Sequence, residues 1–173
     1  MSLPAPAPIR PVVSRDEAGE FAERTLKNYR FMKAARAFQG ADVHLITHLA
    51  NSLLGLVVFP WEDDFVAPLA ARPLSGLMTV GGAWPAGQQW PRWTIHLGAA
   101  STSTLGDLLY HIRNAVAHRR LRFSSDSPVL RDVNLTIEDF KPKATQAYWR
   151  ASINCEDLET FCELLAYEIS ELR

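Results

Sequence analysis

The sequence predicts a mainly α-helical protein, a bundle of about four or five helices with a β-hairpin inserted before the last helix. Two observations predict this fold class. Four long segments repeat apolar residues at helical spacing. By contrast, residues 133–138 and 147–154 alternate apolar with polar residues, as half-buried strands do. The polar connection from Asp139 to Lys143 is too long for a tight turn, and we expect it to join the two strands as an antiparallel hairpin.

Each of the four long helices has a local signal for its start or its end. The first follows a capping box that begins at Ser14, and the second begins at Asp42 and stops before Pro60. Thr104 and Asp107 form another capping box, which starts the third helix. The first two helices are predicted over about 14–38 and 42–59. The third is predicted to end between residues 120 and 123, and the last to run from residue 154 or 156 to about 172.

Two segments lack such periodicity. Residues 1–13 are rich in proline and are expected to form a disordered or extended N-terminal arm. Residues 60–100 form an irregular insertion, rich in tryptophan, proline and glycine, within a single domain that spans residues 14–173. This insertion holds four of the five tryptophans, which we expect to pin it onto the core.

Composition excludes several classes of protein. The formal net charge is −1, so no global field draws the chain to nucleic acid or to a membrane. The most apolar run is too short to span a bilayer, which predicts no membrane association. The two cysteines, Cys155 and Cys162, lie seven residues apart on one predicted helix and give no disulfide framework. We therefore expect a reducing, cytoplasmic setting.

The dense basic cluster of the chain, residues 111–122, contains a group of residues that could catalyse a reaction. Arg113 and Asn114 are followed by His118 near the end of the third helix. Histidine exchanges protons near neutral pH, so His118 can move a proton to or from a ribose hydroxyl or a leaving oxygen. Arg113 can stabilise charge that grows on a phosphate, and Asn114 can hold the imidazole or a phosphate oxygen. This chemistry needs neither metal nor cofactor, and it favours RNA because the 2′-hydroxyl supplies the nucleophile.

Helix geometry restricts how these side chains can meet. At 100° per residue, Arg113 and His118 lie about 140° apart around a straight helix and cannot project side by side. Two arrangements would bring them together. The helix could end or bend near Ala117, or two copies of the helix could meet in a symmetric dimer and build a shared cleft.

The residues Arg-Asn-x-x-x-His, late on an apolar helix of a small helical protein, resemble the signature of the HEPN superfamily. The run from Asn51 to Pro60, the motif, the hairpin and the final helix are together similar to the plasmid pEK499-type HEPN branch. This resemblance implies a homodimeric endoribonuclease, in many relatives the toxin of a toxin–antitoxin pair, with Arg113 and His118 as the catalytic pair and Asn114 as their polar neighbour. It also implies RNA as substrate and an antitoxin protein as a partner. One position departs from some HEPN toxins, which carry tyrosine where this chain has Arg120.

Other residues complete the predicted site, and less specific interpretations stay open. Candidate RNA- or phosphate-binding side chains are His111, Arg119, Arg120 and Arg122, and candidate cleft-lining side chains are His48 and Asn51. The same cations could instead form only the polar rim of a helix end. A second functional hypothesis is a non-catalytic HEPN module for dimerisation or for binding a nucleotide or partner. His44 and His48 have the spacing of metal ligands on a helix, but no third ligand stands out.

Overall fold

The computed structural model describes residues 15–40, 42–58, 67–77 and 90–171. The predicted N-terminal arm and much of the 60–100 insertion, including Trp61 and Trp84, lie outside the described residues. The fold class agrees with the sequence prediction: the protein is mainly helical, with a small antiparallel sheet before the last helix.

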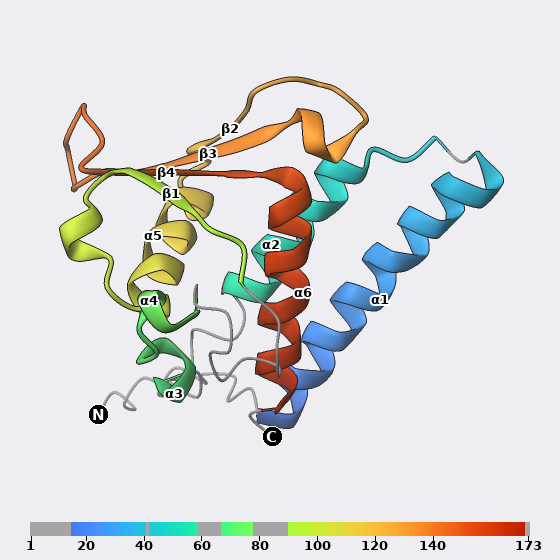
Figure 1. Ribbon diagram of the computed structural model, residues 1–173, viewed down its shortest axis with the longest axis horizontal. Helices are drawn as coiled ribbons and strands as arrows, with labels where there is room; N and C mark the ends of the chain where they lie inside the picture. Colours follow the sequence, from blue (N-terminus) through green and yellow to red (C-terminus); the bar gives the residue numbers. More distant parts are fainter. Residues whose placement is uncertain (1–14, 41, 59–66, 78–89, 172–173) are drawn as a thin grey trace, which may run out of the picture.

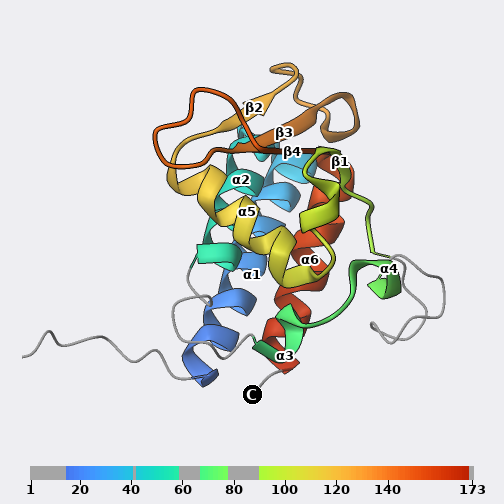
Figure 2. The same ribbon diagram turned by 90° about the vertical axis from the view of Figure 1, so that its left-hand side faces the viewer.

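Four long helices form the body of the molecule. They are α1 (Arg15–Gln39), α2 (Leu45–Val58), α5 (Leu105–Ala117) and α6 (Cys155–Glu171). Two short helices, α3 (Ala67–Ala70) and α4 (Leu74–Leu77), lie in the segment that was predicted to be an irregular insertion. The sheet lies across one end of these helices in both views of the ribbon (Figures 1 and 2). Among the described residues, no helix is both long and apolar enough to cross a membrane.

The sheet is larger than the predicted hairpin. The hairpin is present as β3 (Asn134–Asp139) and β4 (Trp149–Asn154), which pair antiparallel from Asn134 opposite Asn154 to Asp139 opposite Trp149. β1 (Thr94–Leu97) pairs with β4 and β2 (Leu121–Phe123) pairs with β3, giving the order β1-β4-β3-β2. These edge strands are only four and three residues long, too short for a clear alternation in the sequence.

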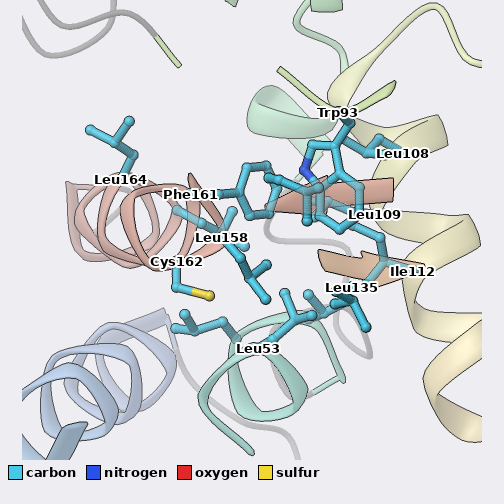
Figure 3. Close-up of a cluster of buried hydrophobic side chains, with 14 of the residues drawn as sticks. Leu53, Trp93, Leu108, Leu109, Ile112, Leu135, Leu158, Phe161, Cys162 and Leu164 are labelled. Atoms are coloured by element: carbon cyan, nitrogen blue, oxygen red, sulfur yellow. The ribbon is translucent and has the colours of Figure 1, made fainter. Parts of the chain in front are cut away.

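The inner face of the sheet packs on the helices and completes one hydrophobic core. Leu135 of β3 meets Leu53 of α2 and Ile112 of α5 in this core (Figure 3). Trp90 and Trp93 pack edge-on against Phe161 of α6, with ring centroids 5.2 and 5.6 Å apart. For these two tryptophans, the prediction that they fasten the irregular segment to the core is confirmed.

A glycine allows the chain before α5 to pass close to Trp149. Gly98 has φ of 81°, and an added Cβ would lie 2.8 Å from Cδ1 of Trp149 and 3.1 Å from the carbonyl oxygen of Tyr148. Gly40 has a similar φ of 63°, yet no described atom would lie within 4 Å of its Cβ. A side chain at Gly40 would therefore meet only backbone strain, whereas one at Gly98 would meet both backbone strain and a steric clash.

Replacing Gly98 with alanine should destabilise the protein more than the same change at Gly40. Gly40→Ala carries only the cost of a left-handed backbone, about 1 kcal/mol. Gly98→Ala adds a clash in a packed region, and we expect a total loss of about 2–4 kcal/mol. Urea unfolding of both variants and the wild type would measure this, and equal losses at the two positions would contradict the packing argument.

Candidate functional site

α5 carries the Arg113-Asn114 pair, and its orientation is fixed at both ends. At its start, the Thr104 hydroxyl accepts a hydrogen bond from the Asp107 amide (3.1 Å), while the Asp107 carboxylate accepts one from the Thr104 amide (2.9 Å). The predicted capping box is therefore confirmed. The predicted apolar stripe is buried as well, and it comprises Leu105, Leu108, Leu109, Ile112 and Val116. Burial of this stripe turns the motif's polar face away from the core.

α5 ends at Ala117, near which one of the two predicted arrangements requires an end or a bend. The Arg119 amide bonds the Val116 carbonyl (3.0 Å) and the Arg120 amide bonds the Ala115 carbonyl (2.8 Å). These are the two bonds of a Schellman motif, with Arg119 at the left-handed position (φ 56°) that glycine usually fills. His118 is the C-cap residue and is exposed, whereas Arg113 is half-buried within the helix. A helix that ends near Ala117 is thus present in the single chain, and a meeting of Arg113 with His118 at this end stays a prediction.

Beneath the motif lies a hydrogen-bond network centred on Asp139. One carboxylate oxygen, Oδ2, accepts from Nδ1 of His111 (2.9 Å), from Nδ2 of Asn114 (3.2 Å) and from the Tyr148 hydroxyl (2.8 Å). The other oxygen, Oδ1, accepts from the Phe140 amide (2.8 Å). Asp139 is 2 % exposed, so these four bonds replace the water that the carboxylate loses on burial.

The network holds Asp139 in its ionised form. Burial alone would raise the pKa of this carboxyl, but the bonds from His111, Tyr148 and Asn114 outweigh burial and lower the pKa below its ordinary value. For Tyr148, burial and the bond to Asp139 both raise the pKa. Since an ionised carboxylate only accepts hydrogen bonds, Nδ1 of His111 carries a proton and the Asn114 amide turns its nitrogen towards Asp139.

His111 belongs to this network and is not at the surface. Its ring is 4 % exposed and stacks on Trp149, with centroids 4.5 Å apart and an interplanar angle of 13°. The Trp149 nitrogen in turn donates to the Thr102 hydroxyl (2.8 Å). Burial argues against the predicted contact between His111 and a phosphate, and we assign this histidine to the support of α5.

The three arginines that follow the motif lie in different surroundings. Arg119 is exposed at the helix end. Arg120 is half-buried, with its guanidinium 4.3 Å from the Phe140 ring centroid and 4.0 Å from Oδ1 of Asp139. Arg122 is exposed on β2 opposite Thr136, on the outer face of the sheet, where it lines a pocket of about 320 Å³. The predicted basic cluster is therefore divided between a helix end and the outer face of the sheet.

The candidate cleft-lining residues lie on α2. Asn51 is exposed and His48 is half-buried, on the same face as the exposed His44 and Thr47, whose Oγ1 lies 3.1 Å from Nδ1 of His44. This polar stripe faces mainly solvent in a single chain, and its place in a shared cleft stays a prediction. Among the described residues, no three His, Cys, Asp or Glu side chains gather as a metal site would require.

Asp139 and Tyr148 are the residues of the site that sequence reasoning missed. A signal for Asp139 was present, because it continues the inward phase of Val133, Leu135 and Ile137 at the end of β3. A carboxylate at an inward position requires buried partners. Two of those partners, His111 and Asn114, come from α5, 28 and 25 residues away along the chain, and the local pattern of β3 does not identify them.

Replacing Arg119 with glycine should stabilise the end of α5. Glycine adopts the left-handed conformation without the steric cost that arginine bears, so we expect a gain of about 1 kcal/mol in the free energy of unfolding. A thermal unfolding scan would show this gain as a higher Tm. A lower Tm would mean that the Arg119 side chain stabilises the fold by more than its backbone strain costs.

Replacing Asp139 with asparagine should destabilise the protein by about 2–4 kcal/mol at pH 7, since buried donors then face an amide nitrogen. The pKa of Asp139 in the folded protein lies below the ordinary value of an aspartate, so the stability that this carboxylate contributes is complete above that ordinary value and is lost as pH falls through the folded pKa. The stability difference between wild type and Asp139→Asn should therefore narrow in acid. Urea unfolding at neutral and acidic pH measures it, and a constant difference would contradict this role.

Comparison with known proteins identifies the family of this chain. The model of one protein family, described as HEPN pEK499 p136, matches residues 1–172. No curated protein and no solved structure matches the chain. The family match covers nearly the whole sequence, including the motif on α5 and the network beneath it. This chain therefore belongs to the HEPN pEK499 p136 family.

Proposed function

We propose that this protein is a metal-independent endoribonuclease that uses Arg113 and His118 as its catalytic pair. Family membership supports a nucleotide-binding or ribonuclease-like module at a coarse level. The observation that carries the finer proposal is the end of α5, where the exposed His118 follows Arg113 and Asn114, and where Asp139 bonds the Asn114 amide. This segment offers a proton carrier, a permanently charged cation and an oriented amide.

The proposed reaction is attack of a ribose 2′-hydroxyl on the adjacent phosphorus, with departure of the 5′-oxygen of the next nucleotide. His118 takes the proton from the 2′-hydroxyl or gives one to the leaving oxygen. The Arg113 guanidinium stabilises the negative charge that develops on the phosphate oxygens. The cleaved strand then carries a 2′,3′-cyclic phosphate and the other fragment a 5′-hydroxyl, so atoms and charge balance without a cofactor.

The bond to Asp139 fixes the orientation of the Asn114 amide. Its Nδ2 atom donates one of its two N–H groups to the carboxylate, so the second N–H and the Oδ1 atom remain for other partners. Oδ1 can accept from an imidazole N–H or from the 2′-hydroxyl, and the second N–H can donate to a phosphate oxygen. Both roles that the sequence left open for Asn114, holding the imidazole or holding a phosphate oxygen, therefore remain part of the proposal.

The proposal includes a homodimer in which the Arg113 and His118 of two chains line one cleft. The polar stripe of α2, which contains His48 and Asn51, faces mainly solvent in the single chain and could line that cleft. An antitoxin protein that covers the basic end of α5 is the second partner in this proposal, and the setting is the cytoplasm.

A non-catalytic module for binding a nucleotide or partner remains the second candidate. One observation favours it: cations at a helix C-terminus are stabilised by the helix dipole and need no substrate to explain them. This candidate predicts binding of RNA or nucleotide that Arg113→Ala weakens, without cleavage by the wild type.

His118→Ala and Arg113→Ala should each lower the rate of RNA cleavage by about 10²–10⁴-fold, the range typical of lost acid–base or charge-stabilising groups. The matched controls are His96→Ala, on the outer face of the sheet, and Arg131→Ala, on an exposed turn between β2 and β3. Denaturing gels of labelled RNA measure cleavage. If wild type and His118→Ala cut at the same rate, or neither cuts, catalysis by this pair is excluded.

Mixing the two inactive variants tests the shared cleft. If each site takes Arg113 from one chain and His118 from the other, a mixed dimer regains one intact site, and an equimolar mixture should recover about a quarter of the wild-type activity. If both residues act within one chain, the mixture stays inactive. Sedimentation velocity confirms that the variants dimerise and exchange.

A further inference from the structure

We propose that Tyr110 and the β3–β4 loop (residues 140–148) form a subsite for single-stranded RNA. One base stacks on the Tyr110 ring, and the two loop lysines, Lys141 and Lys143, contact the flanking phosphates. This subsite rests on the proposed function, because it extends the same RNA path from the end of α5. Nothing in the motif itself involves these three residues.

Tyr110 occupies the centre of the motif's face on α5. At 100° per residue, it lies about 60° from Arg113 and about 40° from Asn114 around the helix, on opposite sides. It is one turn before them along the axis, towards the N-terminus. The side chain is 48 % exposed, although its ring packs edge-on against His111 with centroids 5.5 Å apart. An aromatic ring held at one edge and open to solvent is suited to stacking with an unpaired base.

The β3–β4 loop is fastened over the same end of α5. Asp139, the last residue of β3 before the loop, bonds Asn114. The ring of Phe140, the first residue of the loop, lies 4.3 Å from the guanidinium carbon of Arg120. At its other end, Tyr148 bonds Asp139 and packs edge-on against His111, with centroids 5.6 Å apart. Figure 2 shows this loop, in orange-red, above the C-terminal end of α5.

The loop brings two lysines to this surface. Nζ of Lys141 lies 5.7 Å from the Tyr148 ring centroid, and Lys143 is exposed at a left-handed position (φ 64°). Residues 140–148 contain no acidic side chain. Within the described parts of the chain, neither lysine forms an ion pair with a carboxylate. Both charges are therefore available to phosphates.

The acids nearest in sequence to this surface are already engaged. Asp139 is buried in its network, and Glu138 bonds Arg150 on the outer face of the sheet. Asp107 caps the opposite end of α5. The surface around Tyr110 thus combines exposed cations with an aromatic ring, the composition by which proteins bind single strands. A duplex keeps its bases stacked inside and cannot use the ring.

Tyr167 provides a matched control for Tyr110. It is 46 % exposed on α6, and it lines a pocket together with three acids, Glu23, Glu163 and Glu171, and two cations, Lys27 and Arg30. Arg30 is paired with Glu163, so the acids offset the positive charge around this ring, unlike the surface around Tyr110. Lys27, exposed on α1, is the corresponding control for the two loop lysines.

The test measures binding separately from cleavage. Each variant is made in a His118→Ala background and titrated against a fluorescently labelled single-stranded RNA of mixed sequence, about 12 nucleotides long. Tyr110→Ala should raise the Kd by about 5- to 100-fold, whereas Tyr110→Phe and Tyr167→Ala should leave it within about twofold. A duplex of the same sequence should show no dependence on Tyr110.

The salt dependence of binding tests the lysines. Replacing both Lys141 and Lys143 with alanine should lower the slope of log K against log salt by about 1.4, since each phosphate contact on a single strand contributes about 0.7. Lys27→Ala should leave the slope unchanged. A circular-dichroism spectrum and Tm confirm that each variant is folded.

The outcomes separate this subsite from the proposed catalysis. If Tyr110→Ala weakens single-strand binding but wild-type protein cuts no RNA, the subsite stands and the catalytic proposal fails. If the wild type cuts RNA but Tyr110→Ala binds like the wild type, or Tyr167→Ala loses as much affinity, the subsite is overturned. Absence of any RNA binding overturns both.

Discussion

The buried carboxylate of Asp139 is the interaction on which the site depends. It bonds two residues of α5, His111 and Asn114, and it bonds Tyr148 across the β3–β4 loop. A carboxylate that is 2 % exposed would be strongly destabilising without such donors, so the bonds define both the position of α5 against the sheet and the path of the loop. The helix that carries the motif cannot rotate or slide without breaking the bonds from His111 and Asn114 to Asp139.

The sheet and the helices contribute different parts of this arrangement. Burial of the apolar stripe of α5 decides which side chains face outward, and the capping box and Schellman motif decide where the helix begins and ends. The sheet supplies polar and aromatic contacts to α5. Trp149 of β4 stacks on His111, and Gly98 lets the chain before α5 pass close to that tryptophan. Hydrophobic packing thus sets the coarse position of α5, and polar contacts with the sheet set the fine position.

Much of this fold follows from local sequence patterns, and the rest does not for identifiable reasons. The capping box at Thr104, the apolar stripe of α5 and the β3–β4 alternation are local signals, and each prediction was confirmed. The third helix was expected to end between Arg120 and Phe123, but it ends at Ala117, because Arg119 adopts a left-handed conformation that arginine seldom takes. The second helix begins at Leu45, three residues after the expected N-cap.

The candidate site was predictable only in part. The motif residues could be named from their order, whereas the burial of His111 and its contacts with Asp139 and Trp149 depend on which strand packs under α5. Arg122 illustrates the same limit. Its place in the basic cluster was visible in the sequence, but its position on the outer face of the sheet follows from the register of β2 with β3.

The exposure of His118 has a consequence for how such a protein can change over generations. This histidine caps α5 at the surface, while His111 and Asn114 bond the buried carboxylate. A substitution at position 118 therefore leaves the packing of the domain almost untouched, but one at 111 or 114 disturbs its core. The side chain at the end of α5 can therefore differ between relatives that share this fold, whereas the residues that bond Asp139 cannot change without cost to the fold.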